Sequence, residues 1–291
     1  MRENIADFDV ASIAATRARY PLAFEAPLLV RLRIRATWLA FFVLTAYCFW
    51  TFNLSPVRLW QGSGTLVDIA SRMFPPTVGD AFNDYLWALF QTIAMAFLGT
   101  IIAAVLAVPL GLMCARNIMP VRIAQFLFRR TSDTLRGIDQ VIWALIFVRA
   151  VGLGPLAGIL AIIISDTGTL AKLFSEAIEN ADKKQAEGIR ACGGNAVQTI
   201  RHGIIPQVLP VMLSNVLYIF ESNTRSATIL GIVGAGGIGF YLADRIRTML
   251  WEEASFIMIM ILIAVYVIDW ISKLVRRRLI GGARETAGVV H

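Results

Sequence analysis

Charged residues are scarce in this chain of 291 residues, because only 16% are Asp, Glu, Lys or Arg while 57% are hydrophobic. A soluble domain carries about 25% charged residues, so these are too few to cover a water-facing surface. Apolar runs of about 20 residues recur instead, which is typical of transmembrane helices. The runs lack the alternation of barrel strands. We therefore expect an all-α polytopic membrane protein.

Histidine and cysteine are also rare. His202 and His291 are the two histidines, and Cys48, Cys114 and Cys192 are too far apart to suggest a metal site. We expect no catalytic residue, cofactor or metal on this chain. No Walker A pattern (G-x-x-x-x-G-K-[ST]) occurs, so we also expect no ATP hydrolysis by the chain itself. A short apolar core with a cleavage site is not apparent near the start, so we expect no cleavable signal peptide.

Six apolar segments are expected to cross the membrane. They are residues 36–53, 86–113, 138–151, 156–174, 207–220 and 254–274. Pro109 predicts a kink or an early end in the second of them. The expected organisation is an N-terminal basic arm (1–35), the first span with its external loop (36–81), a transmembrane core (82–280) and a tail (281–291).

The distribution of Lys and Arg predicts the orientation of these spans. The arm, residues 114–136, residues 175–205 and the tail are rich in basic residues. Residues 55–85 and 221–253 carry more acidic than basic residues. By the positive-inside rule the first group is cytoplasmic and the second external. Both termini are then in the cytoplasm, and every connection falls on the side that its charges demand.

The most unusual connection is the polar stretch Glu187–Pro210, which lies between two apolar segments. Helical spacing predicts a helix over 176–192. The residues of its expected stripe are Ile178, Ala181, Gln185, Gly188, Ile189 and Cys192. Gly193-Gly194-Asn195 should end this helix, and a second short helical segment should follow over 196–202. Periodicity alone is equally compatible with an ordinary amphipathic surface loop.

The letters of this stretch resemble the EAA loop of ABC-importer permeases, which has Glu-Ala-Ala, then a Gly four residues after the second Ala, and later a Leu-Pro element. Glu187, Gly193 and Pro206 match in identity and spacing, whereas Ile205 replaces Leu and Gly188-Ile189 replace the alanines. The resemblance implies a type I ABC-importer permease fold whose coupling helix docks on an ATPase subunit. The residues that it assigns to this contact are Glu187, Gly188, Ile189, Arg190, Ala191, Gly193, Gly194, Ile205, Pro206, Leu209 and Pro210.

Two further segments, Trp143–Glu179 and Arg225–Leu242, look like the phosphonate-importer permeases, and the whole resemblance covers residues 82–280. It implies the permease subunit of an ATP-driven importer for phosphonates or related phosphorus oxyanions in the bacterial inner membrane. The implied partners are two ATPase subunits that hold ATP and Mg²⁺, a second permease subunit and a periplasmic binding protein, without nucleic acid. A permease for methionine or another amino acid, an ion-gradient transporter and a structural membrane protein stay open as alternatives.

The glycines at Gly234, Gly236 and Gly239 formally match G-x-G-x-x-G. A dinucleotide site needs a βαβ unit and an acid about 20 residues further on, and neither is expected here. We therefore predict a Gly-rich bend on the external side, where small residues allow close helix packing. The resemblance implies that Gly234, Gly236 and Gly237 contribute to the gate or to the surface under the binding protein.

Polar residues at membrane depth mark either a pathway or a pair. The candidates are Asp139, Arg149, Asp166, Glu221, Asn223 and Arg225. Arg225 would suit an anionic substrate, but Glu221 lies at the i,i+4 spacing that would neutralise it. Asp166 either lines a cavity or packs between helices, and its carboxylate would repel an anion.

Overall fold

Helices are the only regular elements in the described residues of this computed structural model, which are 28–52, 55–79 and 81–287. The chain divides into two units at Ile69. In the first unit, α3 covers Leu28–Thr51, so it begins inside the predicted arm, and α4 runs from Pro56 to Arg72 across the division. Residues 1–27 of the arm and 288–291 of the tail lie outside the described residues.

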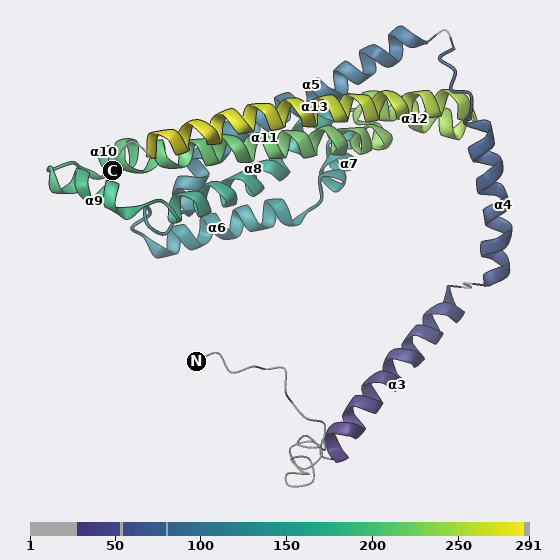
Figure 1. The fold of residues 1–291 in the computed structure, drawn as a ribbon, viewed down its shortest axis with the longest axis horizontal. Helices are drawn as coiled ribbons and strands as arrows, with labels where there is room; N and C mark the ends of the chain where they lie inside the picture. Colours follow the sequence, from purple (N-terminus) through teal and green to yellow (C-terminus); the bar gives the residue numbers. More distant parts are fainter. Residues whose placement is uncertain (1–27, 53–54, 80, 288–291) are drawn as a thin grey trace, which may run out of the picture. The chain divides into compact units, whose positions relative to one another are not determined.

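Four described helical runs of the second unit are long and apolar enough to cross a membrane. They are α5 (Phe82–Cys114), α8 (Pro155–Glu179), the run Ala196–Ala235 that contains α11 (Ile205–Leu230), and α13 (Trp251–Ala287), as Figure 1 shows. They contain the second, fourth, fifth and sixth predicted spans and extend beyond them. Of the kink or early end predicted at Pro109, the early end is wrong, because α5 continues through it to Cys114.

The third crossing differs from its prediction. Only 12 residues, Gln140–Val151, form α7, and a rise of about 1.5 Å per residue makes it shorter than the roughly 30 Å hydrocarbon core. The preceding helix, α6 (Arg122–Gly137), also packs against α8. The assignment of the whole basic segment 114–136 to a connection between spans is therefore wrong. Together α6 and α7 follow α8, with a break at Ile138–Asp139.

Glycine allows α6 to come this close. A Cβ atom on Gly168, near the middle of α8, would lie 2.7 Å from the carbonyl oxygen of Ser132 and 3.1 Å from Cβ of Leu135. The backbones of α6 and α8 are thus in direct contact at this crossing. Close backbone approach at small residues is how helices associate in lipid, where burial of apolar area supplies little driving force.

Close approach at glycines also joins α5 and α8, which form the most extensive helix pair among the described residues. A Cβ atom on Gly99 would lie 2.6 Å from Cγ2 of Ile162, and one on Gly111 would lie 2.8 Å from Cβ of Phe174. The face of α5 that is buried here consists mainly of small residues spaced three or four apart, namely Ala88, Thr92, Ala96, Gly99, Ala103, Ala107 and Gly111.

Short elements close the two ends of this bundle. One end carries α9 (Lys183–Ala191), α10 (Ala196–Gln198) and the π-helical segment η1 (Thr199–Ile204). The other carries the π-helical segment η2 (Gly231–Ala235) and α12 (Ile238–Arg247). Figure 1 places α9 and α12 at opposite ends of the long helices, and we refer to the α9 end and the α12 end.

Candidate functional site

The α9 end is built from a chain reversal between α8 and α11. α8 ends at Glu179, and Asp182 begins a new helix by accepting a hydrogen bond from the Lys184 N–H at 3.0 Å. The prediction of one helix over 176–192 is therefore wrong. An Asp side chain at this position caps the first turn of a following helix and so favours a restart over continuation.

The predicted end of this helix is confirmed, because α9 stops at Ala191 and Gly193 adopts a positive φ of +84°. Asn195 then starts the next helical run through a capping box with Gln198, in which each backbone N–H donates to the other side chain at 2.9 Å. The short helical segment predicted over 196–202 is also confirmed as α10 and η1. Together with α11 they form one continuous run, and π-helical turns within such runs are frequent at functional sites.

One face of α9 is attached to the bundle. A Cβ on Gly203 of η1 would lie 3.1 Å from both Ala186 Cα and Ile189 Cδ1, so the two elements are in close contact. Gln207 of α11 accepts from the Asp182 N–H at 2.9 Å and donates to the Asp182 carbonyl at 3.1 Å. The packed face is thus formed by Ala186 and Ile189. Of the predicted stripe, Ile178, Ala181 and Ile189 are buried or half-buried, whereas the remaining residues, Gln185, Gly188 and Cys192, are exposed.

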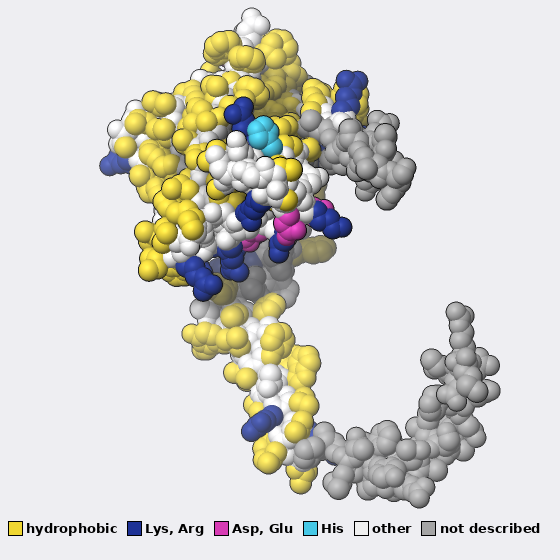
Figure 2. All heavy atoms as spheres, turned by 90° about the vertical axis from the view of Figure 1, so that its left-hand side faces the viewer, with side chains coloured by type: hydrophobic (Ala, Val, Ile, Leu, Met, Phe, Trp, Pro, Cys, Tyr) yellow, Lys and Arg dark blue, Asp and Glu magenta, His cyan; other side chains and the backbone are white. Residues whose placement is uncertain are grey.

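The opposite face of α9 is exposed. Its exposed residues include Lys183, Lys184, Glu187, Gly188, Arg190 and Ala191. Figure 2 looks onto this end and shows Lys and Arg side chains outnumbering Asp and Glu side chains among apolar patches. Of the other residues that the resemblance singles out, Ile205, Pro206, Leu209 and Pro210 lie in the first turns of α11. α9 is therefore a short, charged helix that packs on η1 with one face and is exposed on the other.

A half-open polar cavity of about 280 Å³, which we call the central cavity, lies where α6 breaks into α7. α8 and α11 form its other walls. The polar residues that line it are Arg136, Asp139, Gln140, Ser165, Asp166, Ser222, Asn223 and Ser226. Its apolar lining is Ile138, Val141, Ile219, Ile229 and Leu230. The predicted site residues Asp166 and Asn223 thus come together here from α8 and α11.

A hydrogen-bond network holds the wall of this central cavity. The buried Asn223 side-chain amide donates to Asp166 and, at 2.8 Å, to the Thr100 hydroxyl of α5. Gln140 Nε2 of α7 donates to Asp166 Oδ1 at 2.9 Å and to Asn223 Oδ1 at 3.1 Å. Asp166 therefore both lines a cavity and packs between helices, the two roles that its sequence left open. Gln140 and Thr100 were missed, although both are polar residues beside or within apolar segments.

Arg225 and Glu221 lie elsewhere, on the side of α11 that faces α13. Arg225 Nη1 lies 3.7 Å from Glu221 Oε1 and 3.4 Å from Asp269 Oδ1. Arg276 Nη2 adds a contact of 3.5 Å to Glu221 Oε2. The pairing predicted from the i,i+4 spacing is present and extends to α13. Among the lining residues, the basic side chain of the central cavity is Arg136.

The remaining polar candidates flank α7. Asp139 caps this helix by accepting from the Val141 N–H at 2.8 Å, and Arg149 is exposed in its last turn. Asp139 lines the central cavity, whereas Arg149 does not.

The Gly-rich bend is confirmed between η2 and α12. Gly234, Gly236 and Gly237 have φ values of 101°, 78° and 76°, which L side chains rarely adopt. The Gly237 N–H donates to Gln91 Oε1 at 3.1 Å, and the Ile238 N–H donates to Thr92 Oγ1 at 2.8 Å. The start of α12 is thereby fixed on α5. These glycines shape the α12 end and lie outside the lining of the central cavity.

Comparison with known sequences finds several permease proteins that are similar to this chain. A family model described as binding-protein-dependent transport system inner membrane component matches residues 107–282. The putative phosphite transport system permease protein HtxC of Stutzerimonas stutzeri is 36% identical, over 88% of this chain and 90% of its own. The phosphate-import permease protein PhnE of Mycolicibacterium smegmatis is 37% identical, over 78% of this chain and 43% of its own. The putative cryptic phosphonate transport system permease protein PhnE2 of Escherichia coli is 45% identical, over 42% of this chain and 99% of its own.

Solved structures share the helical arrangement. A chain of the MetNI methionine ABC transporter in an inward-facing conformation aligns with a TM-score of 0.61 at 19% identity, over 70% of this chain and 99% of that chain. A chain of an amino acid ABC transporter aligns with a TM-score of 0.57 at 19% identity, over 67% and 93%. The fold is that of type I ABC-importer permeases, as the resemblance implied. The chain belongs to the family of binding-protein-dependent transport system inner membrane components, which are multi-pass membrane proteins.

Proposed function

We propose that this chain is the permease subunit of an ATP-driven importer for phosphonates or related phosphorus oxyanions. The observation that carries the proposal is the exposed helix α9, which presents Glu187 and Arg190 at one end of the bundle and turns at Gly193. These positions match the EAA loop. The substrate class is supported by the relatives, whose names specify phosphite, phosphate and phosphonate.

In this proposal the α9 end faces the cytoplasm, together with both termini. The supporting observation is its basic character, because Lys183, Lys184, Arg190 and Arg201 of α9 and η1 are all exposed. Two partner ATPase subunits bind ATP and Mg²⁺ and dock on α9, and hydrolysis takes place in those chains. A periplasmic binding protein delivers the substrate at the α12 end. A second permease subunit, either this chain or a paralogue, completes the pathway.

The coupling route follows from how α9 is attached. Its packed face contacts η1, and Gln207 links Asp182 to α11 through two hydrogen bonds. The same α11 carries Asn223 to the wall of the central cavity. A displacement of α9 by the ATPases would therefore move that wall. In thermodynamic terms, contacts made at α9 bias two arrangements of the bundle that differ in access to the cavity.

The central cavity is the candidate translocation path. A phosphorus oxyanion needs hydrogen-bond donors and positive charge. The Ser222 and Ser226 hydroxyls offer donors, and the Arg136 guanidinium, whose Nη2 lies 3.1 Å from Asp133 Oδ1, offers the charge. Asp166 carries the wrong charge for this anion, but its oxygens accept hydrogen bonds from Asn223 and Gln140. In this proposal Asp166 and Asn223 stabilise the wall. Glu221, Arg225 and the glycines Gly234, Gly236 and Gly237 stay predicted gate or path residues.

Substitutions in α9 test the coupling role. Glu187→Ala and Gly193→Asp are each expected to lower ATP-dependent uptake at least about fivefold, because a lost charged hydrogen bond costs about 1.5–3 kcal/mol and a side chain at positive φ costs about 1–2 kcal/mol. Membrane insertion should be unchanged, because neither residue packs in the core. Gln185→Ala, also exposed on α9, is the matched control. Normal uptake by both test variants would refute the coupling role.

A further inference from the structure

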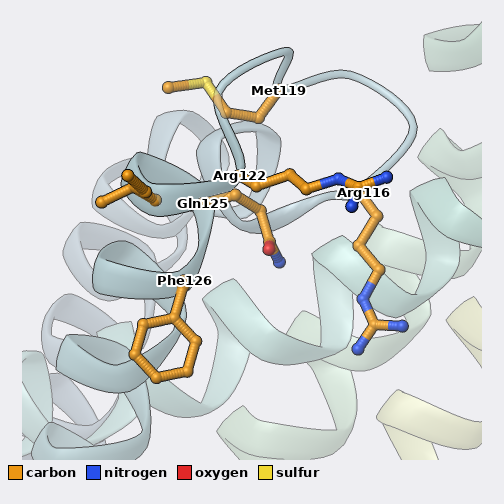
Figure 3. A pocket seen from close by; sticks show the side chains of 6 residues that line it. Arg116, Met119, Arg122, Gln125 and Phe126 are labelled. Carbon is orange, nitrogen blue, oxygen red and sulfur yellow. The ribbon is translucent and has the colours of Figure 1, made fainter.

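A second cavity lies at the α9 end, where α5 is connected to α6. Its volume is about 660 Å³, and its lining is Arg116, Met119, Arg122, Ile123, Gln125 and Phe126. Figure 3 shows the Arg122 side chain extending towards Arg116, with the amide of Gln125 beneath them and the ring of Phe126 further along α6. None of these residues lines the central cavity or belongs to α9.

In the part of the chain that the structure describes, the two arginines of this cavity have no acidic partner. Among the described residues, the guanidinium groups of Arg116 and Arg122 make no hydrogen bond or ion pair. The Arg116 backbone N–H donates to Glu179 at 3.0 Å, but the Glu179 carboxylate lies 3.5 Å from Arg129. By contrast, Arg130 of the same helix is 3.2 Å from Asp133. Two uncompensated positive charges therefore face one cavity.

Large apolar side chains lie beside these charges. Ile123 is 81% exposed, Phe126 is 58% exposed and Leu127 is 63% exposed. They lie in the first two turns of α6, which a short connection joins to α5, a strongly apolar helix that is long enough to cross the membrane. Free cations next to exposed apolar side chains at the end of a span are the pattern of the membrane–water interface, where phosphate groups and acyl chains meet.

We infer that this cavity binds an anionic phospholipid, with its phosphate on Arg116 and Arg122 and its acyl chains against Ile123 and Phe126. A soluble phosphorus oxyanion would satisfy the guanidinium groups but would leave the apolar side chains exposed to water. The lipid accounts for both. Because α6 runs from this site to Arg136 at the central cavity, a bound lipid would hold the outer end of a helix that forms the cavity wall.

Lipid titration of the full-length chain in a neutral detergent tests this inference. Binding is followed by native mass spectrometry with phosphatidylglycerol, phosphatidylcholine and inorganic phosphate as separate probes. The intact chain should bind phosphatidylglycerol in preference to phosphatidylcholine, and inorganic phosphate should not compete with the bound lipid. Arg116→Gln/Arg122→Gln should bind phosphatidylglycerol about 30-fold more weakly, since each arginine near an anionic surface contributes roughly fivefold. Arg122→Gln alone should show about a fivefold loss.

The matched control is Arg277→Gln/Arg278→Gln, which removes the same charge from two exposed positions of α13. It should bind phosphatidylglycerol as the intact chain does, and Arg116→Lys/Arg122→Lys should keep most of the binding. Unchanged lipid binding in both glutamine variants of the cavity would overturn the inference. Equal losses in the control, or inorganic phosphate displacing the lipid, would also overturn it. Loss of a copurifying ATPase with lipid binding intact would assign this surface to a protein contact instead.

Discussion

The Asn223 side chain connects four helices within the bundle. From α11 it reaches Thr100 of α5, Asp166 of α8 and Gln140 of α7, and it is only 2% exposed. Buried polar groups in lipid-embedded proteins are costly unless they are paired. We therefore expect Asn223 to hold α5, α7, α8 and α11 in position around the central cavity.

Asn223→Ala is expected to lower the stability of the purified chain by about 1–3 kcal/mol, because it leaves Asp166 and Gln140 without one of their partners. Thermal unfolding in detergent measures the effect. The control is Ser222→Ala, which changes a neighbouring lining residue on the same helix without breaking this network. Equal melting temperatures for the two variants would show that the network does not hold the bundle together.

Asp166 and Asn223 could be found from the sequence because a polar side chain at membrane depth is costly and therefore indicates a pathway or a hydrogen-bond partner. Gln140 escaped notice because it stands at the beginning of an apolar segment, where a polar residue costs little. The role of Arg225 could not be decided, since the i,i+4 spacing to Glu221 is the same in a simple pair and in a pathway. The contact of Arg225 with Asp269 could not be predicted either, because Asp269 lies on another helix.

Among the helix contacts, the crossing of α6 and α8 depends on Gly168, because a glycine has no side chain that would keep the two backbones apart. Gly168 faces the carbonyl oxygen of Ser132, and the backbone on that side cannot move without moving α6. Since α6 leads into the central cavity, this crossing sets the position of Arg136 as well. The crossing is thus a structural support for the candidate translocation path.

Gly168→Ala should destabilise the chain by about 1–3 kcal/mol, because the added methyl group cannot be accommodated without a backbone shift. Gly188→Ala is the contrasting change. A Cβ there meets no atom within 4 Å, and helix propensity should make it stabilising by up to about 1 kcal/mol. Thermal unfolding of both variants gives the comparison. The account of the crossing fails if Gly168→Ala is as stable as Gly188→Ala.

Long apolar helices could be predicted because run length alone requires them, and the structure extends the second, fourth, fifth and sixth predicted spans rather than moving them. α6 could not be predicted in place, since a basic amphipathic helix has the same pattern on a surface and against a bundle. Whether it packs depends on Gly168, which lies in another predicted span. The break before α9 depends on one local hydrogen bond at Asp182, which periodicity does not reveal.

For the molecule as a whole, orientation is open to a direct test. Cys192 is exposed beside α9, whereas Cys114 is buried. If the α9 end is cytoplasmic, a membrane-impermeant maleimide should leave Cys192 unlabelled in spheroplasts and label it in inverted vesicles. Thr248→Cys, exposed at the α12 end, should show the reverse pattern. Labelling of Cys192 from outside, lost in Cys192→Ser, would reverse the orientation.

Family and fold could be predicted from the sequence because Glu187, Gly193 and Pro206 keep the identity and spacing of the EAA loop of ABC-importer permeases. The sequence says less about which substrate is transported. The central cavity is small and formed by residues from several helices, and in this class of importer the binding protein delivers the substrate. The relatives therefore carry more of the argument for phosphorus oxyanions than any one side chain does.

Uptake into proteoliposomes tests the central claim most directly. The chain is reconstituted with its ATPase and binding-protein partners, and phosphite, phosphate, a phosphonate and methionine are offered as labelled substrates. We predict uptake of a phosphorus oxyanion that requires ATP on the side of α9, requires the binding protein and persists when the proton gradient is collapsed. Uptake that ignores ATP and follows the proton gradient, or transport of methionine alone, would contradict the account.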